Sequence, residues 1–306
     1  MKKFRIIITI ILFLMTIGIG YGIYYYGKTN IKLDKDYTKL VDNLVSINNE
    51  INNSDNSSSV INKNIEDLNN IENIIVEKQK NVYKLGSDLE KQIRSGNNKY
   101  KIAYLTFDDG PYYNTFNVFK VLKEHNVKAT FFTTDTNGSK CYDNRNYDCR
   151  NMYAYYKLYG HTIANHTYTH SIFSGLYSST SNFMNAIINQ ENLIKSKTGL
   201  TPNIMRFPGG SATAGSLRNS IKSELYKRGY GWVDWTAQDG DGGNLSGQQQ
   251  ARNNFQSSIN EDIEVVLFHD YSNITTPLLP EFIKYLEDRN YILLPLFYES
   301  VMVNKG

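Results

Sequence analysis

The stretch KIAYLTFDDGP, residues 101–111, predicts a buried strand that ends in a functional loop. Hydrophobic residues dominate its first seven positions, and Gly110 with Pro111 is typical of a turn. Between them stand Asp108 and Asp109, whose like charges repel. The pair is explained by an ordinary turn or helix cap, or by a metal ion that binds one carboxylate and leaves the other free to accept a proton.

Short β-rich segments alternate with helical patterns from residue 101 onward. This alternation is typical of parallel strands joined by crossover helices, and seven strands suit a barrel or a doubly wound sheet. The expected strands cover residues 101–107, 128–133, 161–165, 203–207, 230–236, 263–268 and 291–296, and the expected helices cover residues 114–125, 181–198, 215–228, 248–260 and 277–289.

Ionisable and polar side chains follow five of these strands at the point where each strand ends. Because functional residues of such folds collect at the carboxyl ends of the strands, we expect these side chains on one rim. They are Asp108 and Asp109 after the first strand, Asn165, His166 and His170 after the third, Arg206 after the fourth, Asp239 and Asp241 after the fifth, and His269 and Asp270 after the sixth.

Two histidines lie four residues apart in the segment HTYTH, residues 166–170. On a helical turn His166 and His170 face the same way, and imidazole is a common zinc ligand. The spacing alone also suits a hydrogen-bonded pair on a helix face. A carboxylate from the first strand would complete a set of two histidines and one acid, which leaves positions open for water and substrate.

The N-terminal segment predicts a membrane anchor. Lys2, Lys3 and Arg5 precede an uncharged run from Ile6 to Tyr26, which is long enough to cross a bilayer. The basic flank places the N-terminus in the cytoplasm and the rest of the chain outside the cell. An uncleaved single-pass anchor over residues 1–27 is our interpretation; the alternative is a signal peptide that is cleaved to release a secreted protein.

A polar segment, residues 28–97, separates this anchor from the β-rich domain, residues 98–306. Its apolar residues recur at helical or coiled-coil spacing, which predicts a helical stalk that could dimerise the protein or recruit a partner; a disordered linker is the alternative. The net charge of the chain is only +3, and no basic stripe with interleaved aromatic residues is present, so nucleic acid is not an expected partner.

The two cysteines, Cys141 and Cys149, lie close together in the segment CYDNRNYDC. Outside the cytoplasm a disulfide between them is permitted, and it would staple a short loop. Two free thiols in a surface loop are the alternative, and the spacing is not that of a metal-binding cysteine pair.

Taken together, the motifs of residues 100–298 resemble the polysaccharide deacetylase family with the NodB-homology domain, carbohydrate esterase family 4. Five motifs stand in the family's order, and this makes the resemblance much more specific than any one of them. They are TFDDG at residues 106–110, HTYTH at 166–170, RFPGG at 206–210, DWTAQDGDG at 234–242 and LFHD at 267–270. The resemblance implies a distorted (β/α)7 barrel.

The resemblance also implies a role for each matching position. Asp108 would be the general base and Arg206 its partner, while His269 would be the general acid. Asp109, His166 and His170 would bind one divalent metal ion, usually zinc and sometimes cobalt in this family. The backbone N–H of Gly209 would face the oxyanion, and Leu267 and Trp235 would line the pocket for the acetyl group or the sugar.

The fourth motif departs from the family's usual D-x-x-D-W pattern, because no tryptophan follows its second acid. Counting from Trp235 selects Asp241 as the acid that supports His269, and Asp239 remains the close competitor. In the third motif FPGG replaces the more common aromatic residue after proline, so the pocket is expected to differ in shape.

The resemblance implies hydrolysis of N-acetyl groups on a cell-wall glycan, with release of acetate. Because an anchored domain would face the wall, peptidoglycan N-acetylglucosamine is the preferred substrate. Chitin-type oligomers, an exopolysaccharide and N-acetylmuramic acid residues are the alternatives, and acetyl esters of a xylan-like polymer are a further one. A catalytically inactive glycan-binding module is a rival of another class, although all the expected catalytic positions are filled.

Overall fold

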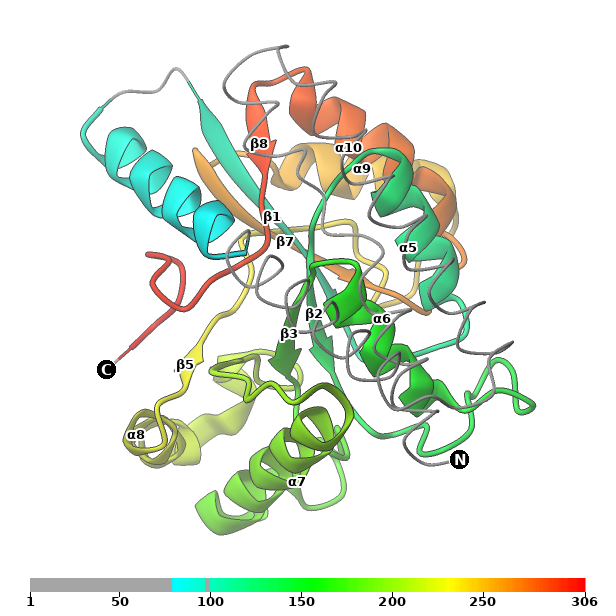
Figure 1. The fold of residues 1–306 in the computed structure, drawn as a ribbon, viewed down its shortest axis with the longest axis vertical. Helices are drawn as coiled ribbons and strands as arrows, with labels where there is room; N and C mark the ends of the chain where they lie inside the picture. Colours follow the sequence, from blue (N-terminus) through cyan, green and yellow to red (C-terminus); the bar gives the residue numbers. More distant parts are fainter. Residues whose placement is uncertain (1–78, 97–99, 306) are drawn as a thin grey trace, which may run out of the picture.

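The computed structural model describes residues 79–96 and 100–305 (Figure 1). The predicted membrane anchor and most of the predicted stalk therefore lie outside the described residues, and both stay predictions. Among the residues that are described, no helix is both long and apolar enough to cross a membrane.

The centre of the domain is one curled sheet in which all the paired strands are parallel. The strand order is β5-β4-β3-β2-β1-β7-β6, and β8 pairs with β1 outside this path. Helices surround the sheet on its outer side (Figure 1). The strands are β1 (Lys101–Asp108), β2 (Thr130–Thr133), β3 (Thr162–Asn165), β4 (Ile204–Met205), β5 (Gly231–Trp232), β6 (Ala237–Gln238), β7 (Ile263–His269) and β8 (Tyr291–Leu293).

Strand β1 occupies the middle of this sheet and is buried along almost its whole length. Its first residues pair with β8 and its last residues with β2, while β7 runs beside it throughout. Such burial on both sides explains why its sequence is hydrophobic without alternation. The register sets Asp108 opposite His269 at the carboxyl end.

The expected strand over residues 230–236 is interrupted. Gly231 and Trp232 pair with β4 as β5, whereas Ala237 and Gln238 pair with β7 as β6. The residues between them cross from one edge of the sheet to the other, where Thr236 N–H donates to the carbonyl of Val265 at 2.9 Å. The sheet is thus curled into a half-barrel consistent with the fold that the resemblance implied.

The expected helices are all present, with ends that differ by a few residues from the sequence prediction. The segment after β2 adds a short helix that packs tyrosines into the core. The helices are α5 (Thr115–Glu124), α6 (Met152–Leu158), α7 (Thr180–Thr198), α8 (Arg218–Lys227), α9 (Gln248–Ser258) and α10 (Leu279–Glu287).

Residues 79–94 form a further helix that packs on the base of the sheet, although the sequence placed this segment in the stalk. Leu89 and Ile93 are buried in the main hydrophobic core. The buried Glu90 accepts hydrogen bonds from the Tyr104 hydroxyl at 2.7 Å and the Ser300 hydroxyl at 2.6 Å. This helix is therefore part of the folded domain.

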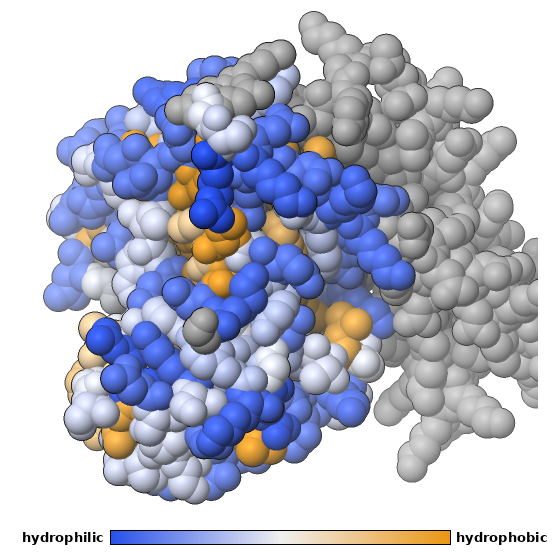
Figure 2. Space-filling model, turned by 90° about the vertical axis from the view of Figure 1, so that its left-hand side faces the viewer, coloured by the Kyte–Doolittle hydropathy of each residue, from blue (hydrophilic) through white to orange (hydrophobic). Residues whose placement is uncertain are grey.

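The surface on the left-hand side of Figure 1 is mainly hydrophilic, with small apolar patches, as Figure 2 shows.

A disulfide joins Cys141 and Cys149 in the loop between β2 and α6. Both cysteines are buried, and the Cys141 N–H donates to the carbonyl of Tyr147 at 3.0 Å. Of the two alternatives that the sequence left open, the structure has the stapled loop.

Candidate active site

The side chains singled out by the sequence gather where the strands end. Asp108 ends β1 and Asp109 follows it, and His166 and His170 follow β3. Arg206 follows β4, Asp241 follows β6 and His269 ends β7. Parallel strands bring their carboxyl ends to one edge, so residues that are far apart in the chain meet there.

Asp109, His166 and His170 form a cluster that fits a metal ion. The Asp109 Oδ1 atom lies 3.5 Å from His166 Nε2 and 3.2 Å from His170 Nε2. One ligand atom from each residue lies within 4.8 Å of the other two. Asp109 Oδ1 is buried and accepts no hydrogen bond. A buried carboxylate oxygen without a donor is costly, and a bound cation would satisfy it.

His166 is held in the tautomer that suits a ligand. Its Nδ1 atom lies 2.8 Å from the backbone carbonyl of Arg206. Because a carbonyl only accepts, Nδ1 carries the proton and the Nε2 lone pair faces Asp109. Burial and the charge of the neighbouring His170 lower the pKa of His166 to about 3, so the ring is neutral at physiological pH.

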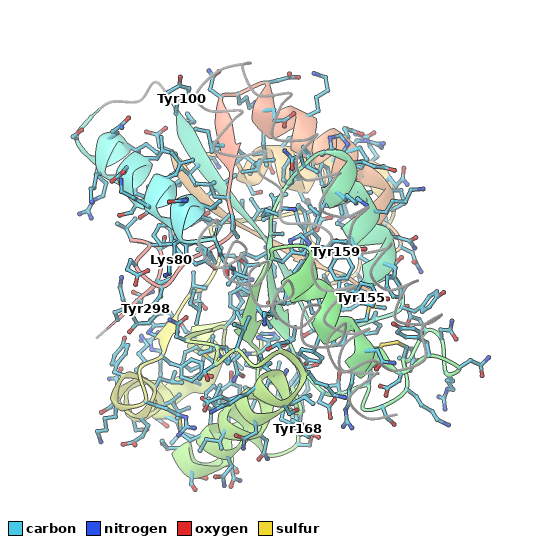
Figure 3. All side chains as sticks on the ribbon, viewed as in Figure 1. Lys80, Tyr100, Tyr155, Tyr159, Tyr168 and Tyr298 are labelled. Atoms are coloured by element: carbon cyan, nitrogen blue, oxygen red, sulfur yellow. A yellow bond between two sulfur atoms is a disulfide. The ribbon has the colours of Figure 1, made fainter. Side chains whose placement is uncertain are left out.

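The two histidines meet in a loop and not on the helical turn that the spacing suggested. Thr167 and His170 both adopt positive φ angles, 66° and 48°, which no α-helix contains. The side chain of Asn165 accepts from Thr167 N–H at 2.9 Å, and Tyr168 N–H donates to Ala186 of α7. Figure 3 shows Tyr168 beside α7. This anchored, left-handed loop turns both rings toward Asp109.

Asp108 and Arg206 form a buried ion pair beside this cluster. Arg206 Nη1 donates to Asp108 Oδ1 at 2.8 Å and to the Thr106 hydroxyl at 2.8 Å. The guanidinium also stacks over the Phe132 ring, 4.2 Å from its centroid. Burial raises the pKa of Asp108, and the charge of Arg206 opposes that rise. The second oxygen, Oδ2, lies 3.6 Å from His166 Nε2 and thus faces the cluster.

His269 lies beside Asp109 of the cluster and is held by Asp241. Its Nδ1 lies 2.7 Å from Asp241 Oδ1, and its backbone N–H donates to Asp241 Oδ2 at 2.9 Å. Burial lowers the pKa of His269, but the hydrogen bond and charge of Asp241 outweigh it and raise the pKa to about 9. The free Nε2 lies 3.8 Å from Asp109 Oδ2.

The structure separates the roles of the two acids that the sequence left in competition. Asp241 is the one that contacts His269. Asp239 lies behind it and accepts from the Thr275 hydroxyl at 2.6 Å, and the same hydroxyl lies 2.9 Å from Asp241. Asp239 also accepts from the Asp241 N–H at 3.1 Å. Asp239 therefore helps to position Asp241.

The three residues expected to bind substrate stand on elements that also carry residues of the cluster or its neighbours. Leu267 precedes His269 by two positions on β7, so both side chains leave the same face of the strand. The Trp235 ring lies 5.8 Å from the Arg206 guanidinium and against Gly210. Gly209, with a φ of 72°, belongs to the loop that follows β4.

Two supporting residues were not assigned a role from the sequence. The backbone of Gly242 lies in close contact with the His269 ring, because a Cβ atom at this position would lie only 2.6 Å from His269 Cε1. The tryptophan that the family usually has here would force His269 to move. Asp270 is buried beneath Gly110 and accepts from the Thr115 hydroxyl at 2.6 Å. Burial raises its pKa to about 8, so this carboxyl is mostly protonated at neutral pH.

This fold and this cluster define a class of metal-dependent hydrolases, and comparison with known proteins agrees. The sequence profile of the polysaccharide deacetylases matches residues 95–226. A peptidoglycan-N-acetylglucosamine deacetylase of Bacillus cereus is 28% identical over 228 residues, which cover 71% of this chain and 79% of that protein.

Solved structures resemble the chain in the same way. The catalytic domain of a peptidoglycan N-acetylglucosamine deacetylase from Eubacterium rectale is 31% identical, with a TM-score of 0.60 over 67% of this chain and 92% of that domain. A carbohydrate esterase family 4 enzyme of Streptococcus mutans is 26% identical, with a TM-score of 0.57 over 69% of this chain and 90% of that one. The chain belongs to the polysaccharide deacetylase family, and it is a polysaccharide N-deacetylase.

Proposed function

We propose that this enzyme removes the acetyl group from N-acetylglucosamine residues of peptidoglycan, with a zinc ion bound by Asp109, His166 and His170. One observation carries the proposal: the cluster that could bind a metal ion lies next to both a buried carboxylate, Asp108, and a histidine cation, His269. Relatives named for this substrate support the choice of glycan. Imidazole and carboxylate ligands with open positions suit zinc, and cobalt is the alternative.

A bound divalent ion would polarise the acetyl carbonyl and make an attacking water more acidic. Asp108 accepts the proton of that water on Oδ2, while Oδ1 is held by Arg206. The raised pKa of Asp108 makes it a stronger base than an exposed aspartate. The backbone N–H of Gly209 donates to the developing oxyanion.

The leaving amine needs a proton from the opposite side. His269 supplies it from Nε2, because Asp241 holds the ring protonated through Nδ1. Amide cleavage then yields acetate and the free amine of the sugar. Leu267 and Trp235 hold the acetyl group and the sugar beside these atoms.

The N-terminal sequence supports a location at the cell membrane. The apolar run of residues 6–26 would hold the chain in the cell membrane as a single-pass protein, with the deacetylase domain outside and facing the wall. A domain held there would reach peptidoglycan before any glycan of the surroundings.

Acetate release from full-length protein tests the proposal. Zinc-loaded and chelator-treated enzyme would be incubated with purified peptidoglycan and with N-acetylglucosamine oligomers. We expect release that requires metal and is faster on peptidoglycan. Faster release from the oligomers would reassign the substrate to chitin-type glycans, and absence of release from both, with zinc shown to be bound, would refute N-deacetylation of these sugars.

A further inference from the structure

Aromatic side chains lead away from His269 along one rim of the active site. The Tyr271 ring lies 5.1 Å from the His269 ring, and the Tyr112 ring lies 5.2 Å from Tyr271, measured between centroids. Both tyrosines are half-buried. Neither belongs to the groups that carry out the proposed reaction.

Two further tyrosines, on the segments that adjoin this rim, are more exposed. Tyr113 follows Tyr112 in the chain and packs against Tyr147 of the disulfide loop, 5.5 Å between centroids. Tyr113 is 42% exposed, and Tyr142 of the same disulfide loop is 74% exposed. Both rings therefore present apolar surface to solvent, where a ligand can contact it.

The disulfide loop is firmly attached to the segment that leaves the active site. The Asp143 carboxylate accepts from Tyr113 N–H at 2.7 Å and from Asn114 N–H at 2.9 Å. Just before the loop, the Asn137 side chain donates to the carbonyl of Pro111 at 3.0 Å. Tyr142, next to Asp143, is therefore presented on a short loop closed by the Cys141–Cys149 bond.

We propose that Tyr271, Tyr112, Tyr113 and Tyr142 form an aromatic track that binds the glycan chain next to the sugar being deacetylated. A sugar ring has an apolar C–H face and polar hydroxyl edges, and tyrosine matches it with an apolar ring and a hydrogen-bonding hydroxyl. The track begins at His269, so a chain lying on it continues directly from the reacting sugar.

The stapled loop gives this track a physical advantage. A ring presented on a closed, hydrogen-bonded loop loses little freedom when a ligand binds, so more of the contact energy appears as affinity. The disulfide then serves glycan binding as well as stability. This inference rests on the proposed function, since it assumes that the reacting sugar lies at His269.

Binding without turnover tests the track separately from catalysis. Chelator-treated full-length protein would be titrated with N-acetylglucosamine tetramer by calorimetry. We expect Tyr142→Ala to raise Kd about threefold to tenfold, as the loss of one aromatic contact implies, and Tyr142→Phe to restore most of the affinity. The double variant Cys141→Ser with Cys149→Ser is expected to weaken binding as Tyr142→Ala does, with an unchanged circular dichroism spectrum.

Phe173 offers a matched control, because it is a fully exposed aromatic residue on the loop that follows His170 and is not one of the tyrosines of the track. Phe173→Ala is expected to bind the tetramer with wild-type affinity. Wild-type affinity of Tyr142→Ala, or an equal loss in Phe173→Ala, would overturn the track. Binding that depends on Tyr142, in a protein that releases no acetate even when loaded with zinc, would refute the proposed reaction and leave the track standing.

A kinetic comparison supplies a second readout. For the zinc-loaded enzyme, the ratio of kcat/KM on the tetramer to kcat/KM on a chromogenic acetyl ester is expected to fall about threefold to tenfold in Tyr142→Ala. An unchanged ratio would contradict a role in binding the chain.

Discussion

The ion pair of His269 and Asp241 predicts a specific change in the pH dependence of the enzyme. Burial lowers the pKa of His269, but Asp241, with smaller contributions from the charges of Asp109 and Asp108, raises it to about 9, against an ordinary value of 6.5. This difference corresponds to ~3 kcal/mol of preference for the protonated ring. Asp241→Asn keeps the shape of the side chain and an oxygen for the Nδ1 hydrogen bond, but it removes the charge. Burial then lowers the pKa of His269 to its ordinary value or below.

The direction of the change in activity is set by His269, because its protonated form is the active form. A raised pKa keeps His269 protonated below pH 9, and the proton is lost as the pH rises through about 9. At pH 7.5 a group with a pKa of 9 is almost fully protonated, whereas a group with a pKa of 6.5 is protonated in about one molecule of ten. We therefore expect Asp241→Asn to lose at least about tenfold in kcat/KM at pH 7.5.

The assay is acetate release from a soluble acetylated oligomer between pH 5 and pH 10, since kcat/KM reports the ionisation of the free enzyme. In wild type we expect kcat/KM to fall as the pH rises through about 9, which is the alkaline limb of the profile. In Asp241→Asn we expect this alkaline limb near pH 6.5 or below. Asp239→Asn is the matched control, because Asp239 does not contact His269, and its limb should move much less. An alkaline limb that stays near pH 9 in Asp241→Asn would refute the reasoning.

Further predictions concern the base, the metal, the buried arginine and the N-terminal helix. Asp108→Asn should retain bound zinc, measured by elemental analysis, and lose about 10²- to 10⁴-fold in kcat; wild-type turnover would remove Asp108 as the base. His170→Ala should lose zinc on dialysis against a weak chelator that leaves wild type loaded, and equal retention would contradict its role as ligand. Arg206→Met should lower the free energy of unfolding by about 3–5 kcal/mol, because Asp108 stays buried without its partner. Leu89→Ala should lower it by about 2–5 kcal/mol in urea denaturation, and an unchanged midpoint would mean that residues 79–94 do not belong to the folded domain.

Local sequence determined much of this architecture. The strands are short apolar runs bounded by turn residues, and the chemistry follows them directly, so the rule that parallel strands share one edge was enough to collect Asp108, Asp109, Arg206 and His269. The order of five motifs identified the family. These features arise from residues that are adjacent in the chain, so the sequence alone is enough to predict them.

Contacts between distant residues decided the rest. The spacing of His166 and His170 suggested a helix, but hydrogen bonds to Asn165 and α7 hold them in a left-handed loop. Asp239 and Asp241 are alike in sequence, and only the approach of β7 determines which of them meets His269. Residues 79–94 look like a continuation of a polar stalk, yet Glu90 and Leu89 find partners far along the chain. Helix periodicity reports that one face is apolar but not which surface covers it, so the position of this helix depended on the tertiary fold.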